Sequence, residues 1–135
     1  MKPTLQSGVA ASRAFTVDRE RTIDFMGEKA RVYATPMLVR DIEMTCRELL
    51  LQHLDAGEDS VGTRVEIDHI AATLMGQRVE LKAKVVKVEG RAVVFEVEGH
   101  DGVEAICRCS HARFVVDVAK TEQRLAAKAA KAGLA

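Results

Sequence analysis

The chain has 135 residues, of which 47% are hydrophobic and 30% are charged, and its formal net charge at pH 7 is zero. This length allows one domain with a substantial hydrophobic core. The balanced charge, with four Phe, one Tyr and no Trp, argues against a nucleic-acid-binding protein. Such a protein needs a basic surface and commonly uses aromatic side chains to stack bases.

Targeting signals are weak in this sequence. No apolar run is long enough to span a membrane, and the first thirty residues contain no hydrophobic signal-peptide segment. We expect residues 1–11 to form a loose N-terminal leader. The three cysteines are an odd number without a disulfide spacing, which favours a reducing compartment. We therefore expect a cytoplasmic protein that contacts neither membrane nor nucleic acid.

The first half of the chain predicts a strand, a connection and one long helix. Ser12–Val17 is a candidate strand, and Thr22–Ala34 is a connecting segment. Thr35 is a good helix N-cap, and Pro36 suits the first helical position because its missing N–H would be unpaired there. The helix should end near Leu54, before a Gly and several turn-forming residues.

Within this helix, apolar residues recur every three or four positions and predict a buried face made of Val39, Ile42, Cys46, Leu49, Leu50 and His53. The same spacing predicts a polar, solvent-facing side made of Arg40, Asp41, Arg47, Glu48 and Gln52.

After the helix the apolar period changes to two, which is typical of half-buried strands. In residues 61–69 the alternation puts Val61, Thr63, Val65, Ile67 and His69 on one face. A second strand covers residues 79–88, with a phase slip at Val85 and Val86 that predicts a bulge. A third covers residues 93–98, and a tight turn at Asp101 and Gly102 leads into a long last strand over 103–117.

From Val118 onward, a helix rich in Ala and Lys closes the chain. The element order predicts an α+β fold in which an antiparallel sheet curls around one long central helix. We expect a single domain over residues 1–135, with residues 118–135 as a C-terminal helix or tail.

Two titratable residues fall on faces that should be apolar, Glu43 on the helix and His69 on the strand. A buried carboxylate or imidazole is costly unless it is paired, so each is either a satisfied core residue or part of a reaction site. Glu43 alone reads most simply as a boundary carboxylate that reaches solvent or pairs with an Arg. His69 alone reads as a hydrogen-bonded core histidine. Together they make a base and its orienting carboxylate.

Two further polar residues have open interpretations. Thr35 is explained by helix capping alone, but its hydroxyl also lies at the positive end of the helix, where a polarised carbonyl would be stabilised. Arg113 lies in phase with His111 on the last strand. If that face points inward, the guanidinium needs an anionic partner such as Glu43; if it points outward, Arg113 is solvated.

A metal site is the least favoured interpretation of this chain. Cys107, Cys109 and His111 alternate along one strand, but two-residue spacing suits tetrahedral zinc poorly. No second Cys or His pair completes a ligand set. We expect neither a metal nor another cofactor.

Three blocks of sequence carry a resemblance to a known family. They are the helix start T-P-M-L-V-x-x-x-E-x-x-C, the segment DAGEDSVGTRVEIDHIAAT and the segment HDGVEAICRCSHAR. Over residues 35–116 the chain resembles the fluoroacetyl-CoA thioesterases, which belong to the hotdog-fold thioesterase superfamily. The resemblance implies a hotdog fold and the hydrolysis of acyl-CoA thioesters, with CoA thioester as substrate rather than as cofactor.

The resemblance also implies roles for five residues. Thr35, Glu43 and His69 correspond to the catalytic residues of the family, and Gly62 and Arg113 to residues that line the thioester site. Hotdog proteins generally form dimers through their sheet edges, so a homodimer is expected. The connecting segment before Thr35 is shorter and more polar than the family's lid, which predicts a small or medium acyl group rather than fluoroacetyl selectivity.

Two alternatives stay open at this point. The protein could be a non-hydrolytic acyl-CoA-binding or regulatory module, although a mere binder has no need of Thr35, Glu43 and His69 together. It could also be an enoyl-CoA hydratase-type hotdog enzyme, which would leave the thioester intact.

Overall fold

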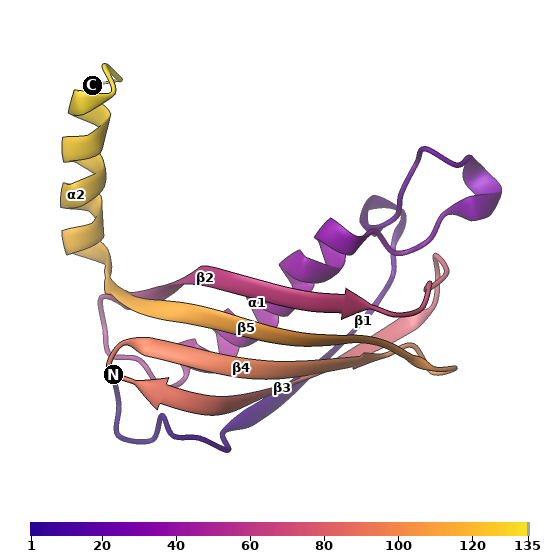
Figure 1. Ribbon diagram of the computed structural model, residues 1–135, viewed down its shortest axis with the longest axis horizontal. Helices are drawn as coiled ribbons and strands as arrows, with labels where there is room; N and C mark the ends of the chain where they lie inside the picture. Colours follow the sequence, from indigo (N-terminus) through magenta and orange to yellow (C-terminus); the bar gives the residue numbers. More distant parts are fainter. Residues whose placement is uncertain (135) are drawn as a thin grey trace.

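The computed structural model describes residues 1–134 and contains a five-stranded antiparallel sheet with strand order β1-β3-β4-β5-β2 (Figure 1). The strands are β1 (Ala10–Thr16), β2 (Glu58–His69), β3 (Arg78–Glu89), β4 (Ala92–His100) and β5 (Ala105–Asp117). Helix α1 (Thr35–Leu51) covers one face of the sheet, here called the inner face, and helix α2 (Val118–Lys131) follows β5. The predicted α+β fold with one long central helix is confirmed.

The core lies between α1 and the inner face of the sheet. Strict alternation in β3 and β4 buries one set of side chains and exposes the other, as the sequence predicted. Helix α1 contributes an apolar stripe to the same core. The buried side chains include Leu38, Ile42, Cys46, Leu49 and Leu50 from α1, and Val79, Leu81, Val85, Val93, Phe95 and Val97 from the sheet.

Strand β2 carries a bulge that changes which side chains face inward. Its pairing with β5 shifts between Gly62 and Arg64, so Thr63 is the extra residue. Before the bulge Gly62 faces α1 and Val61 is 47% exposed; after it, alternate residues down to His69 face inward. The predicted inward position of Val61 is therefore wrong. The one bulge that the sequence predicted, at Val85 and Val86 in β3, is confirmed by a register shift after Val85.

The start of α1 differs from the prediction. Ala34, not Thr35, is the N-cap residue, and Thr35 is already helical. Because Pro36 has no N–H, the first donors are those of Met37 and Leu38, and both donate to the Ala34 carbonyl at 3.0 Å. No backbone donor is left for the Thr35 hydroxyl to cap, so this group is free for another partner.

Asp41 was predicted on the solvent side of α1 and is instead buried, with 2% of its surface exposed. Residues 17–34 fold back over this side of the helix and supply two partners for its carboxylate. Arg21 donates through Nε and Nη2 at 2.9 and 3.1 Å, and the Tyr33 hydroxyl donates as well. The sequence pattern of α1 alone could not indicate a cover that comes from another segment.

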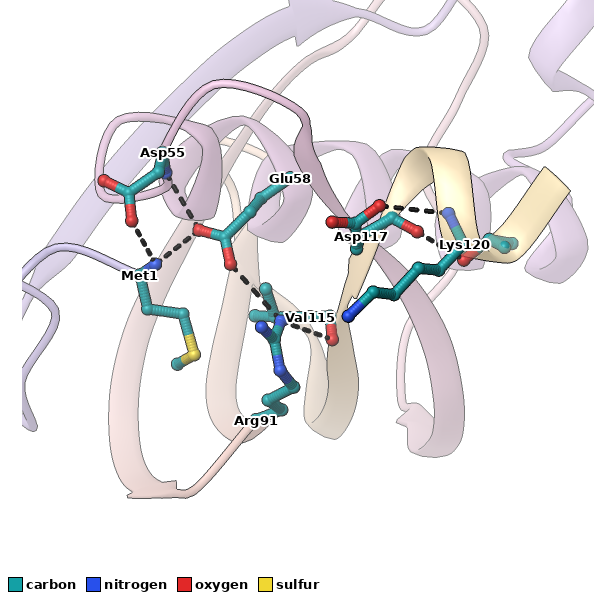
Figure 2. A network of polar contacts seen from close by, with 8 residues as sticks. Met1, Asp55, Glu58, Arg91, Val115, Asp117 and Lys120 are labelled. Atoms are coloured by element: carbon teal, nitrogen blue, oxygen red, sulfur yellow. Dashed lines mark hydrogen bonds and ion pairs between the residues drawn. The ribbon is translucent and has the colours of Figure 1, made fainter. Parts of the chain in front are cut away.

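The N-terminal residues are docked rather than loose. The Lys2 N–H donates to the His53 carbonyl at 2.8 Å, and Leu5 is buried in the core. Figure 2 shows the Met1 amino group between the carboxylates of Asp55 and Glu58. Burial of Leu5 gives this segment a hydrophobic reason to pack against the domain.

Helix α2 begins at Val118, as predicted. Its N-cap is Asp117, whose carboxylate accepts the Lys120 N–H at 3.0 Å (Figure 2). The helix buries no residue and stands away from the sheet (Figure 1). Over residues 1–134, no helix combines the length and the apolar character that crossing a membrane requires.

Candidate active site

The first polar pair of the site joins the start of α1 to the end of β2. Thr35 Oγ1 and His69 Nδ1 are 2.8 Å apart, which is hydrogen-bond distance. His69 Nε2 is buried and has no hydrogen-bond partner within residues 1–134. Burial lowers the pKa of the His69 imidazole, and the Ala71 backbone opposes this effect. The ring is therefore neutral near pH 7 and able to accept a proton.

Thr35 and His69 open into a shallow depression of about 380 Å³. The rest of its lining is apolar or aromatic and comes from the segment before α1 and from the loop after β2: Ile23, Phe25, Val32, Tyr33, Ile70, Ala71 and Ala72. A larger hollow of about 770 Å³ lies on the opposite, outer face of the sheet and contains none of the five predicted site residues. Of these two hollows, the smaller one is where predicted site residues, Thr35 and His69, lie.

The second polar pair lies further along α1. Arg113 Nη1 donates to Glu43 Oε2 at 3.2 Å, while its Nε and Nη2 donate to the Ser60 hydroxyl and carbonyl at 2.7 and 2.8 Å. The Arg113 side chain is 5% exposed and that of Glu43 is 38% exposed. Burial lowers the pKa of Arg113, and the nearby Glu43 carboxylate counteracts that shift. Arg113 thus points inward, which answers the question that the sequence left open.

Gly62 lies directly against this pair. A Cβ atom at position 62 would be 2.4 Å from Glu43 Oε2 and 3.3 Å from His111 Cε1. A side chain there would occupy the space of the carboxylate. Because Gly62 has no side chain, the Glu43 carboxylate can pack directly against the β2 backbone.

His111 belongs to this group and was missed as a functional neighbour. It is fully buried, and its Nδ1–H donates to the Arg64 carbonyl at 2.8 Å. Its Nε2 therefore accepts from Arg113 Nη1, at 3.2 Å. The ring stacks on Phe95, with 6.3 Å between centroids, and burial lowers its pKa. The in-phase spacing of His111 and Arg113 was the signal for this contact.

No part of the chain from residue 1 to residue 134 groups three or more potential metal ligands. Cys107 and Cys109 are buried free thiols, and burial raises their pKa values to about 11. Protonated thiols are poor metal ligands, because the thiolate is the form that binds. Both nitrogens of His111 are already engaged in hydrogen bonds.

The five predicted site residues therefore form two groups, Thr35 with His69 and Glu43 with Gly62 and Arg113. Thr35 and Glu43 are eight residues apart on α1, or about 12 Å along its axis. Glu43 contacts Arg113, whereas the partner of His69 is Thr35. The interpretation of Glu43 as the group that orients His69 does not match this geometry. Both pairs nevertheless face the same side of the sheet.

Comparison with known families agrees with this fold. Residues 17–119 match the model of the fluoroacetyl-CoA-specific thioesterase family. The chain belongs to this family.

Its relatives match over almost their whole length. The chain is 30% identical over 135 residues to the fluoroacetyl-CoA thioesterase of Streptantibioticus cattleyicolor, covering 95% of this chain and 97% of the relative. A Phe→Ala variant of a fluoroacetyl-CoA-specific thioesterase superposes with a TM-score of 0.86 at 30% identity, covering 94% and 99% of the two chains. A thioesterase superfamily member from Thermus thermophilus gives a TM-score of 0.89 at 27% identity, covering 98% and 99%. The expected hotdog fold is confirmed.

The close packing of Gly62 against Glu43 generates a prediction. In a Gly62→Ala variant the new methyl group should push the Glu43 carboxylate away from Arg113, because the clash is with the flexible end of a side chain. We expect a folded protein, destabilised by about 1–2 kcal/mol for the lost charged hydrogen bond. A crystal structure and denaturant unfolding measure the two effects. A Glu43 carboxylate still paired with Arg113 in the variant would contradict the prediction.

Proposed function

We propose that this protein hydrolyses CoA thioesters of small or medium apolar acyl groups to the free acid and CoA. Thioester hydrolysis is the activity of its family. The observation that carries the proposal for this chain is the 2.8 Å contact between Thr35 Oγ1 and His69 Nδ1 at the floor of an apolar depression. This contact joins a hydroxyl to a neutral base where an acyl group fits.

In the first half-reaction, Thr35 attacks the thioester carbonyl. His69 takes the hydroxyl proton through Nδ1 as the Oγ–C bond forms, which is how a paired base activates a weak nucleophile. The C–S bond then breaks, and the sulfur of CoA leaves as a thiolate. This thiolate then takes the proton from His69. The N-terminus of α1 lies beside Thr35 and stabilises the negative charge that develops on the carbonyl oxygen.

In the second half-reaction, water attacks the acyl ester on Thr35 and releases the carboxylic acid. His69 takes a proton from the water and passes it to Thr35 Oγ1 as the C–O bond breaks. The Glu43 carboxylate, held by Arg113 and packed on Gly62, orients water from the other side of the thioester site. Every step uses side chains and water, so the mechanism as proposed requires no metal or cofactor.

The acyl group is inferred from the walls of the depression. One fluoroacetyl-CoA-specific thioesterase variant has been solved with fluoroacetate and CoA, and a Thr→Ser variant with acetyl-CoA. Here Ile23, Phe25, Val32 and Ile70 provide apolar surface well beyond what a two-carbon acyl group would contact. Longer or branched apolar acyl groups bury more of that surface and should react faster.

The alternatives gain no support from the structure or the comparisons. A binding module would keep the depression without any need for the Thr35–His69 contact. A hydratase would act on the double bond of an enoyl group and leave the thioester intact. We also propose a cytoplasmic location, because Cys46, Cys107 and Cys109 are all free thiols; cell fractionation tests it.

We further propose that the protein is a homodimer that joins the β2 edges of two chains. Strand β2 is twelve residues long and lies at the end of the sheet, so its outer edge has unpaired backbone groups. Light scattering should give the mass of two chains. A Val65→Pro substitution, which removes a donor from this strand, should shift the mass toward one chain; a monomeric wild type would contradict the proposal.

The function itself is tested by thiol release across a panel of acyl-CoAs from acetyl to octanoyl, with phenylacetyl-CoA included. We expect turnover by the wild type, fastest on apolar acyl groups of about four to eight carbons. His69→Ala should reduce kcat about a hundredfold or more, because the base is lost.

Two variants of Thr35 are the matched controls. Thr35→Ser keeps the hydroxyl and should retain activity, whereas Thr35→Ala should lose it and show no acyl-enzyme by intact mass. Full activity in Thr35→Ala would rule out attack by this hydroxyl. The absence of thiol release from every acyl-CoA by the wild type would rule out the hydrolase.

The pH dependence follows from the burial of His69. The reaction requires the neutral imidazole, and burial lowers its pKa below the ordinary value of 6.5. Activity should therefore persist as the pH falls through 6.5 and decline only below it. The acid limb of kcat/KM against pH reports this value for the free enzyme. A midpoint above 6.5 would mean that the base is solvated or paired with a carboxylate.

A further inference from the structure

Asp41 is a buried carboxylate that the proposed mechanism does not use. It lies six residues after Thr35 on α1 and is 2% exposed. Its partners are the bidentate Arg21, whose side chain is 17% exposed, and the Tyr33 hydroxyl. An apolar side chain of similar size would fill this position without the desolvation cost of an ion pair. The network is therefore hard to explain by stability alone.

The network fixes the ring of Tyr33 from several directions. The hydroxyl donates to Asp41, and the Tyr33 backbone N–H donates to the Thr73 carbonyl at 2.8 Å. The ring packs edge-on against Phe15, with 6.1 Å between centroids. The Arg21 guanidinium in turn lies over the Phe15 ring, 4.6 Å from its centroid. Few side chains in this protein are held at so many points.

Tyr33 also packs against the imidazole of His69. The two ring centroids are 6.4 Å apart and the planes are at 79°, an edge-to-face arrangement. His69 Nε2 has no hydrogen-bond partner within the described residues, so no hydrogen bond at that atom fixes the ring. Its orientation depends on Thr35 at Nδ1 and on the rings and backbone packed around it.

We propose that Tyr33 is a positioning residue, held in place by Asp41 and Arg21, that sets the orientation of the His69 imidazole toward Thr35. This inference rests on the proposed function of His69 and Thr35. Neither Tyr33 nor Asp41 takes part in bond making. A shift of about 1 Å at a reacting group is enough to lower the rate by two orders of magnitude. A side chain that holds the imidazole in place, as Tyr33 does, therefore affects kcat.

The experiment compares Tyr33→Phe and Asp41→Asn with the wild type. Tyr33→Phe keeps the ring and removes only the hydroxyl, and Asp41→Asn keeps the size and removes the charge. In both, kcat should fall about tenfold to a hundredfold. KM should change by less than about threefold, because Tyr33→Phe keeps the ring that lines the depression and Asp41 is not part of that lining.

A second measurement reports on His69 without any need for turnover. Nitrogen-15 NMR of the imidazole gives its tautomer and its pKa in each variant. A less constrained ring is better hydrated, so its pKa should rise toward the ordinary value, and the balance of tautomers should change. Thiol release and this NMR signal should change together in Tyr33→Phe.

Glu28→Gln is the matched control on the same segment. Glu28 pairs with Arg19 and Arg31 at the exposed end of residues 17–34, away from Asp41. This variant loosens the segment but leaves Tyr33 in place, so kcat and the His69 signals should stay at wild-type values. Equal losses in Glu28→Gln and Tyr33→Phe would show a general anchoring role and overturn the proposal.

The remaining outcomes are distinguishable. A folded Tyr33→Phe protein with unchanged kcat and an unchanged His69 spectrum overturns the positioning role. If Asp41→Asn does not fold, Tyr33→Phe decides the question alone. If the wild type releases no thiol from any acyl-CoA, the proposed function fails. The NMR comparison then still shows whether Tyr33 orients His69.

Discussion

One helix has to fill the inner face of the sheet, and this helix carries polar side chains on the buried surface. Every buried polar group needs a partner, because an unpaired one costs free energy of the order of a lost hydrogen bond or more. On α1 the buried polar side chains are Asp41 and Thr45, and Glu43 is partly buried. Thr45 finds its partner within the helix, since its hydroxyl donates to the Asp41 carbonyl one turn earlier at 2.7 Å. The two carboxylates must be satisfied from elsewhere, and the architecture around the helix supplies their partners.

Different parts of the chain supply the partners of these two carboxylates. The segment of residues 17–34 folds back over α1 and places Arg21 and Tyr33 on Asp41. The β5 strand places Arg113 on Glu43, and the bulge at Thr63 turns Gly62 toward the same carboxylate. The segment also lines the depression beside His69, so the cover that buries Asp41 is at the same time a wall of the site.

The sequence predicted the elements that follow a regular period and missed those set by contacts between distant segments. The alternation of β3 and β4 and the start of α2 were predictable because one face of a strand, or one cap, decides them locally. The burial of Asp41 was not, since its cover comes from residues 17–34. Strict alternation also misplaced Val61, because a bulge leaves no mark in the apolar pattern of so short a stretch.

For the site, periodicity indicated that Glu43 and His69 are unusual but paired them with each other. The structure pairs each with a different residue, Arg113 and Thr35. The role of Thr35 was obscured by a good local explanation, since a Thr before a Pro reads as a helix cap. Only the backbone hydrogen bonds to the Ala34 carbonyl show that the Thr35 hydroxyl is not needed to cap the helix. His111 was considered as a metal ligand, an interpretation that the sequence did not favour, and its actual partner is the guanidinium two residues away.

The separation of the two pairs means that the proposed dimer along β2 would affect Glu43 rather than the Thr35–His69 pair. Glu43 is partly exposed, and Val61 beside it is an apolar side chain that faces solvent at this edge. A carboxylate that orients water acts best where bulk water is excluded, because solvent weakens its electrostatic effect on a developing charge. Nothing within residues 1–134 covers that side of Glu43 completely. A second chain paired along β2 would cover the exposed edge and enclose the carboxylate. In the proposed dimer, the surroundings of Glu43 would therefore depend on a second chain, whereas the Thr35–His69 pair is already assembled within one chain.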